Sequence, residues 1–253
     1  SCDSMQVYKY MDIGTAKPTV EERKGIVHHM LDVAEPDEDF SVSRYCAMAS
    51  PIVDDILARR KTAIIAGGTG LYMDALIKGN DFAPFPSTGV RERLEQQPIK
   101  EVYAQLTAID PETAARLHLS DKKRIIRAME IYLETGETMT AHNLRTQAIP
   151  PKYTPLWFAL EDENRQDLYD RIDRRVDIMV EQGLIQEVRG LLESGVPRDC
   201  TALQAIGYKE FRPYFEDNAS LDDVVNNIKR NTRHFAKRQY TWFNHQTPIE
   251  WFD

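Results

Sequence analysis

The sequence is poor in the residues that mark several classes of protein. Only three cysteines occur among 253 residues, at positions 2, 46 and 200, and none forms a CxxC pair. This spacing argues against zinc and disulfides and suits a reducing compartment. No apolar run reaches the roughly 18 residues of a membrane span, so none is expected. The six histidines show no ligand spacing, which leaves no case for a histidine metal cluster.

The chain also lacks an excess of positive charge. Its formal net charge is −8, which taken alone counts against a nucleic-acid binder because phosphate contacts need Lys and Arg. The basic residues are nevertheless clustered, in Lys122–Arg127, Arg171–Arg175 and Lys229–Arg238. An acidic protein with such clusters can still hold a polyanion in one groove.

The order of apolar segments predicts an α/β protein with a helical insertion. Short apolar runs at 62–66 and 156–160 predict buried strands, and 28–33 and 249–252 could be further strands. Prolines 84 and 86, and later 150, 151 and 155, enclose a strongly helical stretch. We therefore expect an α/β core in 1–86 and 152–253, interrupted by a small all-helical domain in 87–151. Further helices are expected at 19–24, 41–60, 71–77, 167–181, 183–193 and 220–243.

Several helix ends can be predicted from single residues. Ser41, Ser120 and Ser220 are expected N-caps, Asp110 is expected to cap a helix that begins at Pro111, and Gly136 suits a helix end. Pro51 lies inside the first long helix and predicts a kink or a restart there. In the helix after Ser120, we expect Ile125, Ile126, Met129 and Leu133 to face a core.

The first eighteen residues are the stretch richest in groups that handle protons and phosphate. They contain Asp3-Ser4-Met5-Gln6-Val7-Tyr8 and Met11-Asp12-Ile13-Gly14-Thr15-Ala16-Lys17-Pro18. A carboxylate such as Asp3 can act as a general base or a Mg²⁺ ligand in phosphate chemistry. The alternative is a turn aspartate that hydrogen-bonds its own backbone.

Two further motifs are ambiguous by themselves. Gly67-Gly68-Thr69-Gly70 follows an apolar run and precedes a helix, which suits either a phosphate loop or a tight turn that needs positive φ. Arg171, Arg174 and Arg175 share one helix face. They could clamp a pyrophosphate, or the neighbouring aspartates 170, 173 and 177 could neutralise them.

The last long helix interleaves basic and aromatic residues. Arg230, Arg233 and Lys237 lie on one stripe, beside Tyr240 and Trp242. This pattern suits phosphate contacts with base stacking, although such aromatics more often belong to a core. The basic run at 122–127 in the expected insertion could equally be a solvated surface.

Taken together, these stretches resemble the bacterial tRNA dimethylallyltransferases, also called tRNA isopentenyltransferases. The resemblance covers essentially the whole chain. The residues that carry it are 3–8, 11–18, Gly67-Gly68-Thr69-Gly70-Leu71-Tyr72, Arg171-Ile172-Asp173-Arg174-Arg175-Val176, Ile206-Gly207-Tyr208-Lys209-Glu210 and Lys237-Arg238-Gln239-Tyr240-Thr241-Trp242-Phe243. Each motif is weak alone, and their common order is specific.

The resemblance implies a reaction and a set of site residues. The family transfers a dimethylallyl group from dimethylallyl diphosphate to the exocyclic amine of the adenosine 3′ of the anticodon. By resemblance, Asp3 is the base for that amine, Arg175 is the second catalytic residue, and Arg175 with Arg171 binds the diphosphate. The implied tRNA contacts are Asp3, Ser4, Met5, Gln6, Thr69, Arg91, Lys123, Arg124, Arg127, Gln204, Gly207, Tyr208, Lys209, Lys237, Arg238, Gln239 and Trp242.

The resemblance also implies what lies outside these residues. The family has a P-loop-NTPase-like parallel-sheet core that opens with a strand and a GPTxSGKT loop, which is absent from the 253 residues. We expect that loop, with Mg²⁺, to supply the rest of the diphosphate site, and we assign no metal ligand here. We expect a cytoplasmic monomer that binds the tRNA anticodon stem-loop. The alternatives are an adenylate isopentenyltransferase, a P-loop small-molecule kinase and a non-catalytic RNA-binding module.

Overall fold

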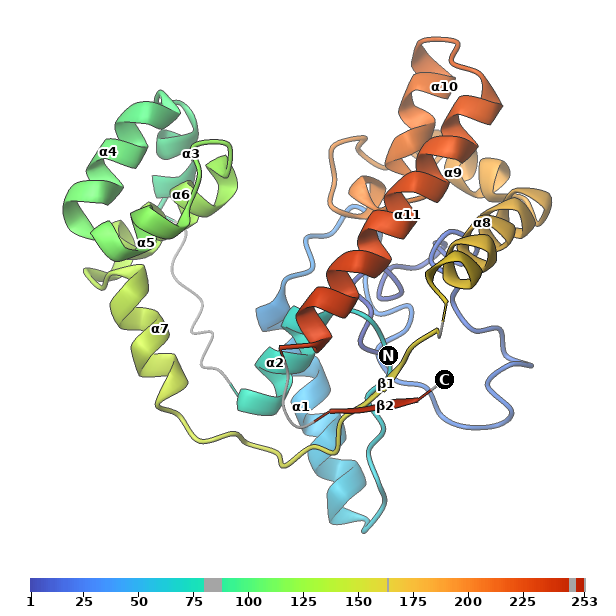
Figure 1. Ribbon diagram of the computed structural model, residues 1–253, viewed down its shortest axis with the longest axis horizontal. Coiled ribbons are helices and arrows are strands. Elements are labelled where there is room, and N and C mark those ends of the chain that lie inside the picture. Colours follow the sequence, from blue (N-terminus) through green and yellow to red (C-terminus); the bar gives the residue numbers. More distant parts are fainter. Residues whose placement is uncertain (80–87, 163, 246–248, 253) are drawn as a thin grey trace. The chain divides into compact units, whose positions relative to one another are not determined.

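The computed structural model describes residues 1–79, 88–162, 164–245 and 249–252. The chain forms two compact units (Figure 1). The first unit comprises Ser1–Ile77 and Tyr153–Asp253, and the second comprises Lys78–Lys152. Residues 80–87, where the sequence predicted a boundary, lie outside the described part of the chain.

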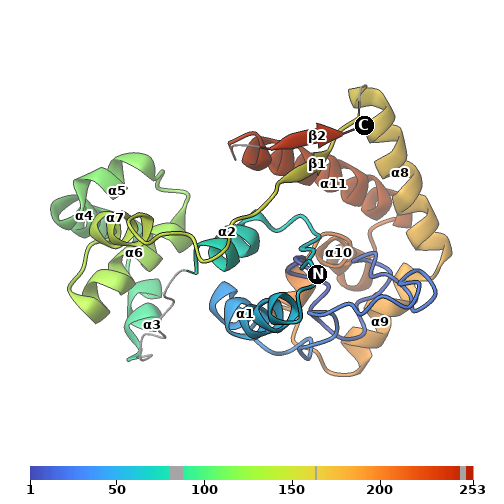
Figure 2. The same ribbon diagram turned by 90° about the horizontal axis from the view of Figure 1, so that it is seen from below.

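The first unit combines helices with a two-stranded parallel sheet. Its helices are α1 (Val42–Ala58), α2 (Gly70–Lys78, which ends at the boundary), α8 (Arg165–Glu181), α9 (Leu184–Glu193), α10 (Arg212–Glu216) and α11 (Leu221–Phe243), with 3₁₀ turns at Ala202–Gln204 and Lys209–Phe211. Strand β1 (Phe158–Leu160) pairs in parallel with β2 (Glu250–Phe252). The Tyr240 ring of α11 stacks on Trp251 of β2 at 5.7 Å, which places the sheet beside the end of α11 (Figure 2).

The core of the first unit includes a long stretch without regular structure. Cys2, Tyr8 and Met11 come before any helix, yet they are fully buried with Tyr45 of α1 and Phe211. Such a loop must satisfy its backbone polar groups without a helix or a ladder of strands. It does so with turns, with side chains and with one isolated bridge between Tyr8 and Ala34.

The second unit has only helices as regular elements among its described residues. It contains α3 (Val90–Glu95), α4 (Ile99–Ile109), α5 (Pro111–Arg116), α6 (Lys122–Thr135) and α7 (Met139–Gln147). Val102, Leu106, Ile125 and Met129 form the centre of its own hydrophobic core. The buried Asp110 accepts hydrogen bonds from the backbone of Thr113 and Thr140, so it caps α5 and fastens α7 to it.

Most predicted helix ends are confirmed. Ser41 and Ser220 cap α1 and α11 through their side chains, and Gly136 ends α6 with φ +72°, in the region that favours glycine. The helix ended by Gly136 begins one residue later than expected, because Asp121 rather than Ser120 precedes it. Pro51 neither ends nor restarts α1, which runs through it as one helix. Proline has no N–H to donate to the carbonyl four residues earlier in the helix. Pro51 lies on the exposed side of α1, so water can donate to that carbonyl instead.

Three predicted elements form neither a helix nor a paired strand with the described residues. Residues 19–24 form turns rather than a helix, and 28–33 form no strand. Residues 62–66 are extended, but they join no ladder with the described residues, and Ile64 is 85% exposed. The strand expected at 156–160 is shorter, and only Ala159 is buried. Leu133 of α6 is likewise half exposed rather than in the core.

Candidate active site

Asp3 closes a tight turn at the start of the chain. Its Oδ1 atom accepts hydrogen bonds from the backbone N–H of Met5 at 2.7 Å and of Gln6 at 3.2 Å. This is the turn geometry that the sequence offered as the alternative to a catalytic role. It occupies only one carboxylate oxygen, since Oδ2 has no hydrogen-bond partner among the described residues. The turn therefore fixes the side chain and leaves one oxygen available for chemistry.

The glycine-rich segment is a packing junction with the Asp3 turn. The backbone N–H of Thr69 donates to Cys2 O at 3.1 Å, and Thr69 Oγ1 accepts from the Ser4 N–H at 2.9 Å. Gly67 has φ +156°, and a Cβ there would lie 2.3 Å from Cys2 O. Thr69, expected to contact tRNA, thus also ties the first residues of the chain to the start of α2.

The same segment is held from the other side by α11. A Cβ on Gly68 would lie 1.7 Å from Gln239 Nε2, and a Cβ on Gly70 would lie 2.3 Å from the Trp242 ring. Gln239 Nε2 also donates to Gly68 O at 3.2 Å. Close approach of α11, as well as positive φ, therefore explains the three glycines. Gln239 and Trp242 are thus connected to the Asp3 turn through the glycine-rich segment.

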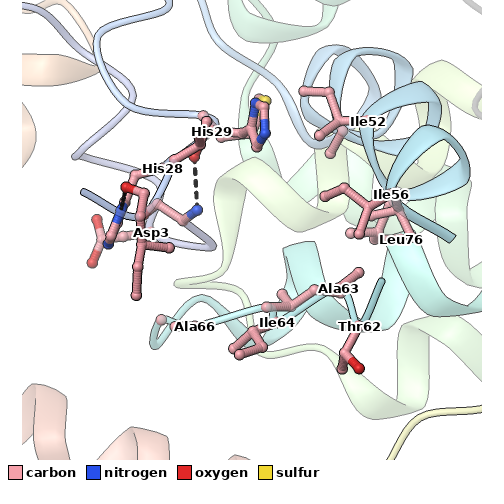
Figure 3. A pocket seen from close by; sticks show the side chains of 18 of the residues that line it. Asp3, His28, His29, Ile52, Ile56, Thr62, Ala63, Ile64, Ala66 and Leu76 are labelled. Atoms are coloured by element: carbon pink, nitrogen blue, oxygen red, sulfur yellow. Dashed lines mark hydrogen bonds between the residues drawn. The ribbon is translucent and has the colours of Figure 1, made fainter. Parts of the chain in front are cut away.

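A cavity of about 770 Å³ opens beside the turn. Figure 3 shows Asp3 and His29 on one side and the apolar side chains of Ile52, Ile56 and Leu76 on the other. The extended segment 61–67 forms a further wall. Concave sites of this size, mostly apolar with a few polar groups, are typical of ligand binding.

The aspartates of α8 do not neutralise the arginines of α8. Asp173 pairs with Arg233, and Asp177 pairs with Lys229 at 2.6 Å, so both acids are committed to α11. Arg171 pairs with Asp162 at 2.8 Å. Among the described residues, the exposed Arg175 forms no ion pair, and neither does Arg174. The helix therefore presents free positive charge that suits an anionic ligand.

Helix α11 links the two parts of this candidate site. Its first half holds α8 through Lys229 and Arg233, and its second half holds the Gly68–Gly70 segment through Gln239 and Trp242. Lys237 and Arg238, which the sequence also assigned to tRNA, are exposed on the same helix. Within the described residues, no hydrogen bond or ion pair joins Asp3 directly to Arg171 or Arg175.

The loop before α10 carries four of the expected tRNA contacts. Lys209 is exposed, and Gln204 donates to Arg198 O. Gly207 has φ +92°, and its N–H donates to the buried Glu210. Tyr208 is only 2% exposed, so in this structure it packs inside the protein and does not offer its ring to RNA.

The expected tRNA residues of the second unit are exposed on α3 and α6. Arg91 and Arg127 both bond to Glu130 Oε2, at 3.1 and 2.7 Å. Arg124 lies 3.8 Å from Asp121, and Lys123 has no ion-pair partner in the described part of the chain. One acid thus draws two arginines together, which keeps a net positive patch in a fixed arrangement.

No group of three His, Cys, Asp or Glu side chains in the described residues is placed to hold a metal ion. The described residues therefore provide no ready-made cluster of ligands for Mg²⁺. The three cysteines are free thiols. Burial raises the pKa of the Cys2 and Cys46 thiols to about 11, which keeps both protonated at neutral pH.

Three supporting residues were not predicted from the sequence. Glu130 gathers the arginines of the second unit, Glu210 holds Gly207, and Glu187 binds the loop at 12–14. Each is a glutamate at a position that local sequence cannot distinguish from a solvated one. For Glu187 only a long-range contact reveals the role, since 175 residues separate it from Asp12.

A family profile described as IPP transferase matches residues 6–246. The chain belongs to this family. An IPP transferase relative, the tRNA dimethylallyltransferase of Anoxybacillus flavithermus, is 48% identical over 99% of this chain and 80% of its own length. The tRNA dimethylallyltransferase of Geobacillus thermodenitrificans is 46% identical over 100% of this chain and 81% of its own.

Solved IPP transferase structures share the fold. The full-length tRNA isopentenylpyrophosphate transferase of Bacillus halodurans is 40% identical with a TM-score of 0.72, over 100% of this chain and 80% of that one. A eukaryotic dimethylallyltransferase, solved acting on tRNA, is 32% identical with a TM-score of 0.81, over 95% of this chain and 62% of that one. In the described residues, no helix is both long and apolar enough to cross a bilayer.

Proposed function

We propose that this protein transfers a dimethylallyl group from dimethylallyl diphosphate to the exocyclic amine of the adenosine 3′ of the anticodon in tRNA. The observation that carries the proposal is the 42–48% identity to tRNA dimethylallyltransferases, over 99–100% of this chain and 80–82% of the relatives. The site supports it, because the Asp3 turn leaves one carboxylate oxygen free.

The proposed chemistry assigns opposite tasks to Asp3 and Arg175. The amine is a poor nucleophile, since its lone pair is delocalised into the adenine ring. As the new nitrogen–carbon bond forms, the carbon–oxygen bond to diphosphate breaks and its electron pair leaves with the diphosphate. Asp3 Oδ2 accepts the amine proton. Arg175, free of ion pairs among the described residues, compensates the growing charge of the leaving group.

Each unit carries residues that we propose to contact tRNA. The target base must leave its stack before its amine can reach Asp3. Ser4, Met5 and Gln6 would surround that base, and Lys237 and Arg238 would contact phosphates. The patch at Arg91, Lys123, Arg124 and Arg127 would bind the anticodon stem, in keeping with the basic and shape-dependent contacts typical of RNA recognition.

We further propose that the fold is completed by the P-loop strand that the family places before the Asp3 stretch. The extended segment 62–66 supports this, because it has no strand partner among the described residues and exposes Ile64. A parallel neighbour would satisfy that edge. The P-loop would bring its own diphosphate contacts, and Mg²⁺ would enter with the diphosphate oxygens. We place the protein in the cytoplasm as a monomer.

Mass spectrometry of tRNA incubated with the full-length protein and dimethylallyl diphosphate tests the function. The expected result is a single added dimethylallyl group on the adenosine 3′ of the anticodon. Transfer to adenosine monophosphate with no transfer to tRNA would instead identify an adenylate isopentenyltransferase. The exposed arginines of the second unit favour tRNA over a free nucleotide. Phosphoryl transfer to a small molecule would indicate the kinase alternative.

A further inference from the structure

The loop at residues 12–17 is folded around a carboxylate from a distant helix. The consecutive backbone N–H groups of Asp12, Ile13 and Gly14 all donate to Glu187 of α9, at 2.8, 2.7 and 3.0 Å. The Tyr208 hydroxyl donates to the same carboxylate at 2.6 Å. Successive N–H groups that converge in this way form an anion-binding concavity, and here the protein supplies the anion itself.

Tyr208 and Gly14 make this arrangement specific. The Tyr208 ring lies so close to Gly14 that a Cβ there would be 2.5 Å from it. Burial, and then the adjacent Glu187 carboxylate, raises the pKa of the Tyr208 phenol far above its usual range. The phenol therefore stays protonated and donates its hydrogen bond at every physiological pH.

A buried lysine holds the same loop from its other end. The Lys17 side chain is 3% exposed, and its ammonium contacts Asp12 at 2.7 Å and Asp32 at 2.6 Å. It also donates to Tyr8 O at 2.7 Å. All three donors of the ammonium are thus used inside the protein. None of them is left to contact phosphate.

The loop held in this way fixes the side chain of Gln6. Gln6 Nε2 donates to Thr15 O at 3.1 Å and to Ala16 O at 3.3 Å. Ala16 adopts φ +49°, a conformation that non-glycine residues rarely keep unless their surroundings impose it. The Gln6 backbone N–H in turn donates to Asp3 Oδ1. The contacts therefore run without a gap from Glu187 through the loop to the Asp3 turn.

We propose that Glu187 is a positioning residue for base recognition. It holds the 12–17 loop so that Gln6 and the Asp3 turn keep the geometry that the target adenosine meets. This inference rests on the proposed role of Asp3 to Gln6 in tRNA dimethylallyl transfer. The inference predicts a defect in the use of tRNA and none in the binding of dimethylallyl diphosphate. The reason is that Glu187 forms no hydrogen bond or ion pair with Arg175, the arginine of α8 proposed to bind the diphosphate.

The test compares Glu187→Ala with the wild-type full-length protein in steady-state transfer assays. The expected fall in kcat/KM for tRNA is about 10–100-fold, the scale of a catalytic group displaced by about 1 Å. The KM for dimethylallyl diphosphate should stay within about twofold of the wild-type value, because the substitution removes no group proposed to bind that substrate. Glu193→Ala is the matched control, since Glu193 is an exposed glutamate on the same helix.

A double-mutant cycle separates positioning from a general loss of stability. If Glu187 acts through Gln6, Glu187→Ala should have little further effect in a protein that already carries Gln6→Ala. The additional fall in kcat/KM for tRNA should be less than about threefold. Effects of the two substitutions that multiply fully would overturn the inference, as would a KM for dimethylallyl diphosphate raised by more than about twofold.

Tyr208→Phe keeps the ring beside Gly14 and removes one donor, so it serves where Glu187→Ala does not fold. It should give a smaller defect of the same kind, and unchanged kinetics in Tyr208→Phe would contradict the proposal. A wild-type protein that modifies no tRNA would refute the proposed function instead, which keeps the two failures distinct.

Discussion

Asp3→Asn separates the two roles that the structure gives to one carboxylate. Asparagine keeps an oxygen at the Oδ1 position, where Asp3 accepts hydrogen bonds from Met5 and Gln6. It replaces Oδ2, the free oxygen, by an amide that cannot accept a proton. The turn should therefore survive while the general base is lost. A general base contributes about 10²–10⁴-fold, which corresponds to roughly 3–5 kcal/mol in the barrier.

The effect of Asp3→Asn on the free energy of unfolding should be much smaller than its effect on the barrier. It should also differ from the effect of Asp3→Ala. Asp3 is half-buried, so water can replace part of what Asp3→Ala removes. We expect Asp3→Ala to lower the free energy of unfolding by about 1–2 kcal/mol, and Asp3→Asn by less than about 1 kcal/mol. Urea denaturation measures these values, and single-turnover transfer to tRNA measures the chemical step.

The comparison has a clear refuting outcome. If Asp3→Asn transfers the dimethylallyl group within about tenfold of the wild-type rate, Asp3 is not the base, because such a loss falls below the usual range for general-base catalysis. If only Asp3→Ala is inactive and it is also unfolded, the carboxylate serves the turn alone. tRNA affinity, measured by filter binding, should change little in Asp3→Asn.

The remaining predictions concern RNA binding, packing and the leaving group. Lys123→Ala with Arg127→Ala should weaken tRNA binding and reduce the slope of log K against log salt by about 1–2 units. Gly70→Ala should lower the free energy of unfolding in urea by about 1–3 kcal/mol, because its Cβ would overlap the Trp242 ring. Arg175→Ala should lower kcat by about 10²-fold or more while tRNA affinity is retained, as judged by single-turnover rates and filter binding.

Each of these predictions has a matched control. Arg116→Ala removes an exposed arginine of the second unit outside the proposed patch. If it reduces the salt slope as much as Lys123→Ala with Arg127→Ala does, the patch is a solvated surface with no specific role in tRNA binding. Gly190→Ala lies in α9 with open space around its Cβ and should stabilise the protein by about 0.5–1 kcal/mol. Arg174→Ala removes the neighbouring free arginine. If it lowers kcat as much as Arg175→Ala does, the positive charge of α8 matters and Arg175 has no specific role at the leaving group.

Local sequence determined the helix ends and the family of this protein. Ser41, Ser220, Asp110 and Gly136 could be read from the chain because caps depend on atoms within a few residues. The ordered motifs were sufficient for the resemblance, which the match to IPP transferases confirms. Segment 62–66 forms no ladder with the described residues, because a strand depends on its neighbours as well as on its own residues.

Only the tertiary structure decided how the charged residues are used. The sequence offered Asp173 and Asp177 as partners for the arginines of α8, and the fold gave both to α11. The sequence likewise assigned no role to the 12–17 loop. The fold brings Glu187, up to 175 residues away, to bind that loop. An ion pair or a hydrogen bond forms with whichever group folding brings within about 3 Å. For residues far apart along the chain, the separation carries no information about that distance.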